Sequence, residues 1–191
     1  PTNPFAENTV ASLRAAVAAG ATGAEIDLVM TRDGVVVLRH DDNLATRSPW
    51  GGQPRTNCHG RISAKTYAAL AHCQAQPHNT RQSATSIDRL DEALAVDGID
   101  LWVLDVKDDA KKRGKKTIRA IARDLERAGA KDDAVIMLYK PATIAYAKTL
   151  GLRACLKRHR RDGLTPDAIA EEVEASGAFA SCANADIVDA P

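Results

Sequence analysis

Short apolar runs that alternate with amphipathic helical segments constrain the fold of this chain more than any other feature. Helical segments are indicated at residues 9–20, 86–95, 115–129 and 164–177, and each carries apolar side chains on one face. The apolar runs around them have the length of strands and read "AEIDLVM", "VVVLRH", "LWVLDVK", "AVIMLY", "LRACLK" and "FASCA". Strands that alternate with helices predict βαβ units and a parallel sheet. Asp33-Gly34 between the first two runs is a tight-turn signal.

One long segment interrupts this alternation. Residues 43–86 are polar and contain Gly51, Gly52, Pro54 and Pro77, with "SAKTYAALAHC" as the single helical candidate. We interpret residues 43–86 as an insertion after the second strand. The total of 191 residues favours one domain, which we expect to span residues 1–191.

The charge pattern excludes several kinds of partner. A net charge of +1 and an aromatic content of 4% argue against nucleic-acid binding. No apolar run reaches the roughly 20 residues that a membrane-spanning helix needs. The basic run at 111–116 is predicted to form a solvated loop and a helix start. The basic run at 157–161 follows a strand, and it is either a solvated loop or an aid to binding an anionic substrate.

Charged residues stand inside otherwise apolar strands. Glu25 and Asp27 are two residues apart and share a face of their strand, as do Asp105 and Lys107. A lone E-x-D pair is most often a solvated strand edge, but the pattern recurs here near the strand ends where α/β folds place active sites. Three converging carboxylates need a cation, and oxygen ligands suit Mg²⁺ or Ca²⁺. Lys107 would then suit an anionic substrate, and His40 would be a proton-transfer group.

The segment that holds these residues is similar to the signature of the glycerophosphodiester phosphodiesterase family. The matching motifs are Glu7-Asn8-Thr9, Glu25-Ile26-Asp27, Thr31-Arg32-Asp33-Gly34 and His40-Asp41-Asp42-Asn43-Leu44. "RLDEAL" and "LDVK" resemble the family's later T-L-E-E-A-L and E-I-K motifs. The similarity is strong over residues 7–44 and weaker beyond.

The resemblance implies a metal-dependent (β/α)₈ TIM-like barrel that hydrolyses glycerophosphodiesters to an alcohol and glycerol phosphate. It makes Glu25, Asp27 and Asp105 ligands of one divalent cation, Mg²⁺ or Ca²⁺. It further makes His40 a catalytic acid or base and Lys107 a phosphate contact. Glu7 and Asp42 are candidates to contact the residues that bind the metal, without binding it themselves.

Departures from the family pattern keep two alternatives open. The family's first strand ends in H-R-G, and this chain begins after that point, so we expect an incomplete barrel that lacks its first and last strands. Asp105 replaces the usual Glu, which resembles the related sphingomyelinase D-like phospholipases. The alternatives are therefore a phospholipase D-like enzyme that acts on phospholipid headgroups, and an inactive binding domain. The partner in each case is a small-molecule phosphodiester or a lipid headgroup; the oligomeric state stays open.

The four cysteines lack the C-x-x-C spacing of a metal site. They are either two disulfides of an exported protein or four buried thiols, so the compartment stays open, with a secreted or periplasmic location slightly favoured. We predict that Cys58 and Cys73 pair, because both lie in the insertion. Cys155 and Cys182 lie in separate predicted strands, and we predict that they remain thiols.

Overall fold

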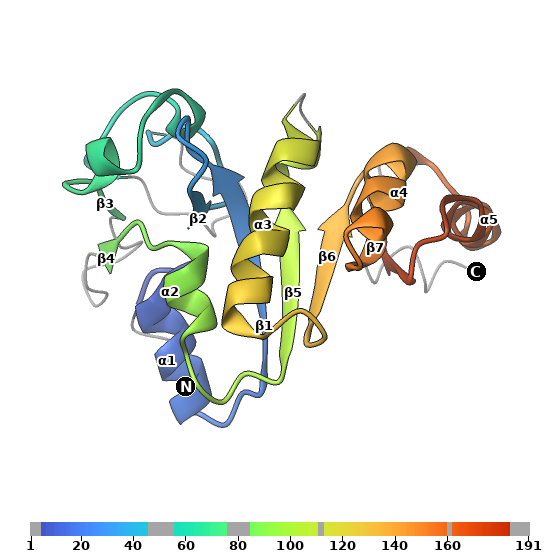
Figure 1. Ribbon diagram of the computed structural model, residues 1–191, viewed down its shortest axis with the longest axis horizontal. Helices are drawn as coiled ribbons and strands as arrows, with labels where there is room; N and C mark the ends of the chain where they lie inside the picture. The colour runs from blue at the N-terminus through green and yellow to red at the C-terminus, as the bar shows by residue number, and fades with distance from the viewer. Residues whose placement is uncertain (1–4, 46–55, 76–84, 111–112, 160–161, 184–191) are drawn as a thin grey trace.

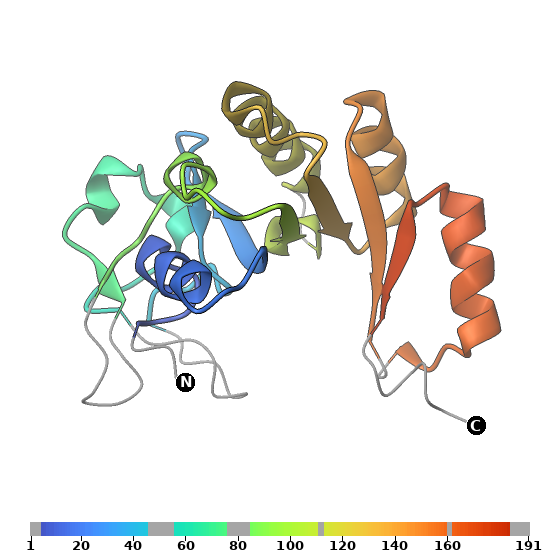
Figure 2. The same cartoon turned by 90° about the horizontal axis from the view of Figure 1, so that it is seen from below.

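The computed structural model describes residues 5–45, 56–75, 85–110, 113–159 and 162–183. All six predicted strands form one sheet in the order β2-β1-β5-β6-β7-β8. Their bounds are β1 Gly23–Met30, β2 Val36–Leu38, β5 Leu101–Val106, β6 Ala134–Leu138, β7 Arg153–Arg158 and β8 Ala180–Ala183. Neighbours from β1 to β8 are parallel. The sheet is curved and no ladder joins β2 to β8 within the described ranges, as expected of an incomplete barrel (Figures 1 and 2).

Five helices follow the outer side of this curve (Figure 2). They are α1 Val10–Ala18, α2 Leu90–Leu94, α3 Gly114–Ala128, α4 Pro141–Thr149 and α5 Pro166–Ser176. Thr165 caps the start of α5, since its side chain accepts a hydrogen bond from the Ala168 N–H. The sequence pattern missed α4, whose only clear signal is Pro141 in its first turn. None of the helices in the described ranges is long and apolar enough to cross a bilayer.

Alternation along the strands separates the two faces of the sheet. Ile26, Leu28 and Met30 of β1 belong to the main core together with Leu104 of β5 and apolar side chains of α3. The intervening residues of each strand therefore point to the concave face. This alternation places Asp27 and its neighbours away from the helices.

The β1–β2 pair is the exception to the parallel arrangement. Leu28 lies opposite Leu38 and Met30 opposite Val36 in an antiparallel pair. The Asp33-Gly34 signal is confirmed as the turn, with Gly34 at a φ of 87° that favours glycine. A connection this short cannot cross over to a parallel strand, so the chain doubles back toward Asp27.

The insertion has a small core of its own. Leu44, Ile62 and Leu70 pack with the Cys58–Cys73 disulfide against Val29 and Val37, on the side of the hairpin away from the main core. Its described regular elements are the 3₁₀ turns η1 Ile62–Ala64 and η2 Ala68–Leu70 and the short strands β3 Gln74–Ala75 and β4 Thr85–Ser86.

The single helix expected in "SAKTYAALAHC" is wrong, because the structure has the two short turns η1 and η2 there. The β1–β2 hairpin forms hydrogen bonds with the backbone between η1 and η2. The Asp33 carboxylate accepts the Tyr67 N–H at 3.1 and 3.2 Å, and the Arg32 N–H donates to the Lys65 carbonyl at 2.8 Å. These bonds hold the backbone in a form that a continuous helix would not allow.

Both pairs of cysteines form disulfides. The predicted Cys58–Cys73 bond is confirmed, with the two Cα atoms 5.5 Å apart. The expectation that Cys155 and Cys182 remain thiols is wrong, because they also form a disulfide, with a Cα separation of 5.7 Å. The reason is the strand order: β7 and β8 are neighbours, and Cys182 lies opposite Lys157, two residues along from Cys155.

Candidate active site

Three carboxylates meet on the concave face of the sheet. Asp27 of β1 lies directly opposite Asp105 of β5 in the parallel register, and Glu25 is two residues before Asp27. One carboxylate oxygen from each of the three lies within 4.8 Å of the others. A set of carboxylate oxygens this close is the donor set that Mg²⁺ and Ca²⁺ prefer. We call Glu25, Asp27 and Asp105 the acidic cluster.

Two ammonium groups offset part of the negative charge of the acidic cluster. Lys107 Nζ lies 2.8 Å from Asp27 Oδ1 and 2.6 Å from Asp105 Oδ2. Lys157 Nζ, from β7, lies 2.6 Å from the same Asp105 oxygen. Burial alone would raise the pKa of Asp105, but Lys107 and Lys157 outweigh it and lower that pKa. Burial likewise opposes the charge of Lys107, and the carboxylates of Asp27 and Asp105 raise its pKa in spite of it.

Tyr139 completes the surroundings of Asp105. Its hydroxyl donates to both carboxylate oxygens of Asp105, at 2.9 and 3.1 Å. Burial and then the negative charge of Asp105 raise the pKa of Tyr139, so the phenol stays protonated and remains a donor. The ring of His159 stacks on the ring of Tyr139 with centroids 5.9 Å apart. Asp105 is thus fixed by three side chains from three strand ends.

Asn8 holds Asp27 in a similar way. The Asn8 amide donates to Asp27 Oδ2 at 2.8 Å, and its carbonyl oxygen accepts the Asp27 backbone N–H at 2.8 Å. Asn8 has a φ of 55°, the single positive value among the described residues other than glycine. Asparagine tolerates this conformation better than most residues, which explains why the side chain can turn back toward β1.

The environment of Glu25 raises the pKa of its carboxyl group. Its partly desolvated position, followed by repulsion from Asp27 and Asp105, raises its pKa to about 7. A divalent cation between the three carboxylates would reverse this effect, because it favours their charged forms.

His40 follows β2 as the chain returns from the hairpin. The preceding Arg39 N–H donates to the Asp27 carbonyl at 2.8 Å, so the backbone passes directly beside the acidic cluster. The His40 side chain is 42% exposed, and its Nδ1 lies 3.2 Å from Asp41 Oδ1. An exposed imidazole oriented by a carboxylate can exchange protons with a bound molecule. Its part in a reaction stays a prediction.

The two predicted supporting residues, Glu7 and Asp42, interact with other groups than the acidic cluster in the contacts that follow. Glu7 is exposed, and its charge acts on the buried Arg39 guanidinium. Asp42 accepts hydrogen bonds from the N–H and the hydroxyl of Ser63, both at 2.8 Å, and thereby ties the insertion to the end of the hairpin. Support of the acidic cluster by Glu7 and Asp42 stays a prediction.

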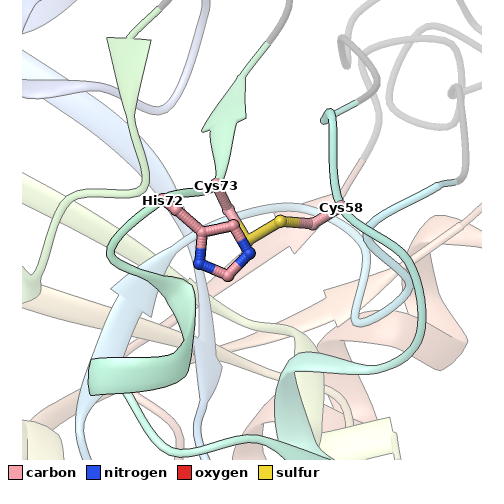
Figure 3. Close-up of side chains that lie close together, drawn as sticks. All are labelled: Cys58, His72 and Cys73. Atoms are coloured by element: carbon pink, nitrogen blue, oxygen red, sulfur yellow. A yellow bond between two sulfur atoms is a disulfide. The ribbon is translucent and has the colours of Figure 1, made fainter.

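A second group of metal-type side chains lies in the insertion. Figure 3 shows the His72 ring beside the sulfurs of Cys58 and Cys73. The two sulfurs are bonded to each other, so neither is a thiolate that could bind a metal. The acidic cluster is therefore the better metal candidate of the two.

Sequence reasoning brought together Glu25, Asp27, Asp105 and Lys107 but did not single out three of their neighbours. The basic run at 157–161 reaches the acidic cluster through Lys157, and its suggested aid to binding an anionic substrate stays a prediction; Arg160 and Arg161 lie outside the described residues. Asn8 stands in the quoted Glu7-Asn8-Thr9 motif, which was its only signal. Tyr139 carries no signal except its place immediately after β6.

Comparison with known proteins identifies the family of this chain. The sequence profile of the glycerophosphoryl diester phosphodiesterase family matches residues 2–161. The uncharacterized protein Rv2277c of Mycobacterium tuberculosis is 30% identical over 145 residues, which are 71% of this chain and 44% of that protein. The chain thus spans less than half the length of this curated relative.

Solved structures show the same fold. The glycerophosphoryl diester phosphodiesterase domain of Rv2277c is 27% identical, with a TM-score of 0.64 over 80% of this chain and 55% of that one. An Oleispira antarctica phosphodiesterase, solved with the product sn-glycerol-3-phosphate, is 24% identical, with a TM-score of 0.72 over 93% of this chain and 69% of that one. The fold is accordingly that of the TIM-like barrels, of which the described strands form an open part. The chain belongs to the glycerophosphoryl diester phosphodiesterase family.

Proposed function

We propose that this protein is a metal-dependent hydrolase that cleaves glycerophosphodiesters into an alcohol and glycerol phosphate. The observation that carries the proposal is the meeting of Glu25, Asp27 and Asp105 within 4.8 Å, with Lys107 beside them. Family membership supports the reaction class. The product bound by the Oleispira antarctica relative supports glycerol phosphate as one half of the substrate.

In this proposal the acidic cluster holds one divalent cation, Mg²⁺ or Ca²⁺. The three residues supply oxygen donors only, which fits either ion. The bound cation would stabilise negative charge on the phosphoryl oxygens and acidify a hydroxyl nucleophile. Asn8 and Tyr139 orient two of the carboxylates through hydrogen bonds of 2.8 and 2.9 Å, as partners of metal ligands usually do.

Lys107 serves as the phosphate contact. Its ammonium already lies between Asp27 and Asp105, so an anion that enters the site meets a fixed positive charge. Lys157 offers a second ammonium on the other side of Asp105. Two cations beside a phosphodiester favour the extra negative charge that develops in the transition state.

His40 transfers one proton in the proposed reaction. A new bond forms between phosphorus and the nucleophile oxygen, which loses a proton, and the bond to the leaving alcohol breaks as that oxygen gains a proton. His40 performs one of these two transfers. The other belongs to the histidine that family members carry in their H-R-G segment.

The test is hydrolysis of glycerophosphocholine by the full-length protein. His40→Ala should lower turnover by about 10²–10⁴-fold while the affinity for the divalent cation stays unchanged. His59→Ala, at an exposed position in the insertion, is the matched control and should turn over normally. Turnover that survives both a chelator and Asp27→Asn would refute the proposal.

A second candidate rests on Asp105, which stands where the family usually has Glu. It is a phospholipase D-like enzyme, which would release the headgroup of sphingomyelin or a lysophospholipid and leave glycerophosphocholine intact. Comparing both substrates under the same metal conditions separates the two activities. Metal-dependent binding of either substrate without turnover would instead indicate an inactive binding domain.

The chain organisation and compartment form the last part of the proposal. Residues 1–191 act as one barrel-type unit, and residues 43–86 are an insertion within it that shapes access to the site. A single cooperative unfolding transition would support one unit. Two disulfides favour an oxidising compartment outside the cytoplasm.

A further inference from the structure

A second charged cleft lies on the helix side of the sheet. It has a volume of about 740 Å³ and is bounded by the tip of the β1–β2 hairpin, the insertion and α3. Among the described residues, one carboxylate, Asp33, and five basic side chains line it: Arg32, Arg113, Lys116, Arg119 and Arg123. The whole chain has 26 basic and 25 acidic residues, so this cleft concentrates positive charge far above the average of the molecule.

The basic side chains come from one face of α3. Lys116, Arg119 and Arg123 are spaced by three and four residues, so they line one side of the helix. Ile118, Ile121 and Leu125 point the other way, into the main core. The basic face is thus a separate surface that core packing does not explain.

Arg113 closes the end of the cleft near the start of α3. Its guanidinium donates to the Thr31 carbonyl at 2.7 Å and to the Ser63 carbonyl at 3.2 Å, and so joins the hairpin to the insertion. Both acceptors are neutral, so these bonds fix the guanidinium without cancelling its charge.

Few carboxylates oppose the remaining charges. The Asp33 carboxylate accepts hydrogen bonds from the Thr31 hydroxyl and the Tyr67 N–H, and these bonds fix it beside the hairpin and the insertion. Arg119 donates to the neutral Tyr146 hydroxyl at 3.0 Å, and Arg123 pairs with Asp124 at 3.0 Å. Arg32, Lys116 and Arg119 are exposed and can reach a bound molecule.

This cleft is distinct from the acidic cluster. Met30, which lines the cleft, belongs to the side of β1 that faces the helices, whereas Glu25 and Asp27 point to the concave side. A phosphate in the cleft would therefore not occupy the proposed catalytic site.

We propose that the cleft is a second anion-binding site, specific for a phosphate-bearing ligand with two or more negative charges. Several spaced cations suit a multiply charged group better than a single carboxylate, and guanidinium groups match phosphate oxygens with paired hydrogen bonds. A cleft of this volume accommodates a phosphorylated headgroup. The ligand is either a free phosphate compound or the phosphate of an anionic lipid, and both present the same chemistry.

The test compares two variants with the same change in net charge. The cleft variant carries Arg32→Gln, Lys116→Gln and Arg119→Gln. The control variant carries Arg14→Gln, Arg127→Gln and Lys148→Gln, which are exposed and lie outside the cleft. Two probes are used with the full chain: inorganic pyrophosphate by calorimetry, and sedimentation with phosphatidylcholine vesicles with or without phosphatidic acid. Thermal unfolding checks that both variants fold.

We expect the cleft variant to bind roughly a hundred-fold more weakly, since each cation near an anionic surface accounts for roughly five-fold. Lys116→Gln alone should lose roughly five-fold. Loss of pyrophosphate binding identifies a free phosphate ligand; loss confined to phosphatidic acid vesicles identifies a lipid headgroup. The proposal is overturned if the wild-type protein binds neither probe, or if the cleft and control variants lose the same affinity. These readouts do not depend on hydrolysis, so they are independent of the proposed enzyme activity.

Discussion

Replacement of Asn8 tests how the acidic cluster is held together. Asn8→Gly removes two hydrogen bonds of 2.8 Å. In one the Asn8 side-chain amide donates to Asp27 Oδ2, and in the other the Asn8 side-chain oxygen accepts from the Asp27 N–H. A hydrogen bond to a charged group contributes about 1.5–3 kcal/mol and a neutral one about 0.5–1.5 kcal/mol. We therefore expect Asn8→Gly to lower the free energy of unfolding by about 3 kcal/mol.

Alanine at the same position separates the hydrogen bonds from the backbone conformation. Asn8 has a φ of 55°, which glycine adopts freely and alanine does not. Asn8→Ala should therefore lose roughly 1 kcal/mol more than Asn8→Gly. Urea unfolding of both variants, with the slope of the transition checked against the wild type, measures the two quantities.

Metal binding gives the functional readout of the same change. Loss of a group that orients a metal ligand typically weakens metal binding about 10–100-fold, so Asn8→Gly should reduce the affinity for Ca²⁺ or Mg²⁺ in that range. If Asn8→Gly unfolds at the wild-type urea concentration and binds the ion with unchanged affinity, the assigned role of Asn8 is wrong.

Three further predictions concern pH, the disulfides and Lys107. Folding raises the pKa of Glu25 from 4.5 to about 7, so between pH 4.5 and about pH 7 the folded chain holds a proton that the unfolded chain has lost. In the presence of a chelator, the free energy of unfolding should therefore fall as pH rises from 4.5 to about 7, and Glu25→Gln should remove this pH dependence. Replacing Cys155 and Cys182, which are 27 residues apart, by serine should lower the free energy of unfolding by about 3.5 kcal/mol, because the unfolded chain gains entropy without the cross-link. Equal melting temperatures of the variant and the wild type would contradict this prediction. In the proposed reaction the Lys107 ammonium contacts the phosphate in the ground state and more strongly in the transition state, so Lys107→Met should raise KM for glycerophosphocholine and lower kcat; a change in KM alone would limit Lys107 to ground-state binding.

Much of the fold follows from local patterns in the sequence. The six strands were recognisable because each is a short apolar run bounded by turn signals, polar residues or a helical segment. The helices α3 and α5 were recognisable because glycines at 129 and 177 end them in left-handed conformations. The helix α4 was missed because its buried Ile144 and Ala147 make a weak amphipathic pattern. The helix in the insertion was wrongly expected because the Tyr67 N–H donates a hydrogen bond to Asp33, which is 34 residues away in the sequence and so outside the local pattern.

Some residues of the candidate site were predictable from the sequence, and others were not. Alternation grouped Glu25 with Asp27, and the position of Asp105 near the end of its own strand together with the family resemblance brought the three carboxylates to one site. Lys157 and Tyr139 reach Asp105 from β7 and the end of β6, and that contact depends on the order of strands in the sheet. The Cys155–Cys182 disulfide depends on the same order, which the spacing of residues along the chain does not reveal.

Calorimetric titration of the chelator-treated protein with Mg²⁺ and with Ca²⁺ tests the central claim most directly. The acidic cluster predicts that one of these ions binds with a stoichiometry of about one per chain. Asp27→Asn should weaken that binding strongly, because it removes one of three charged donors, whereas Asp132→Asn, outside the cluster, should leave it unchanged. Absence of any binding to the wild-type protein, or equal binding by wild type and Asp27→Asn, would contradict the assignment of Glu25, Asp27 and Asp105 as the metal site.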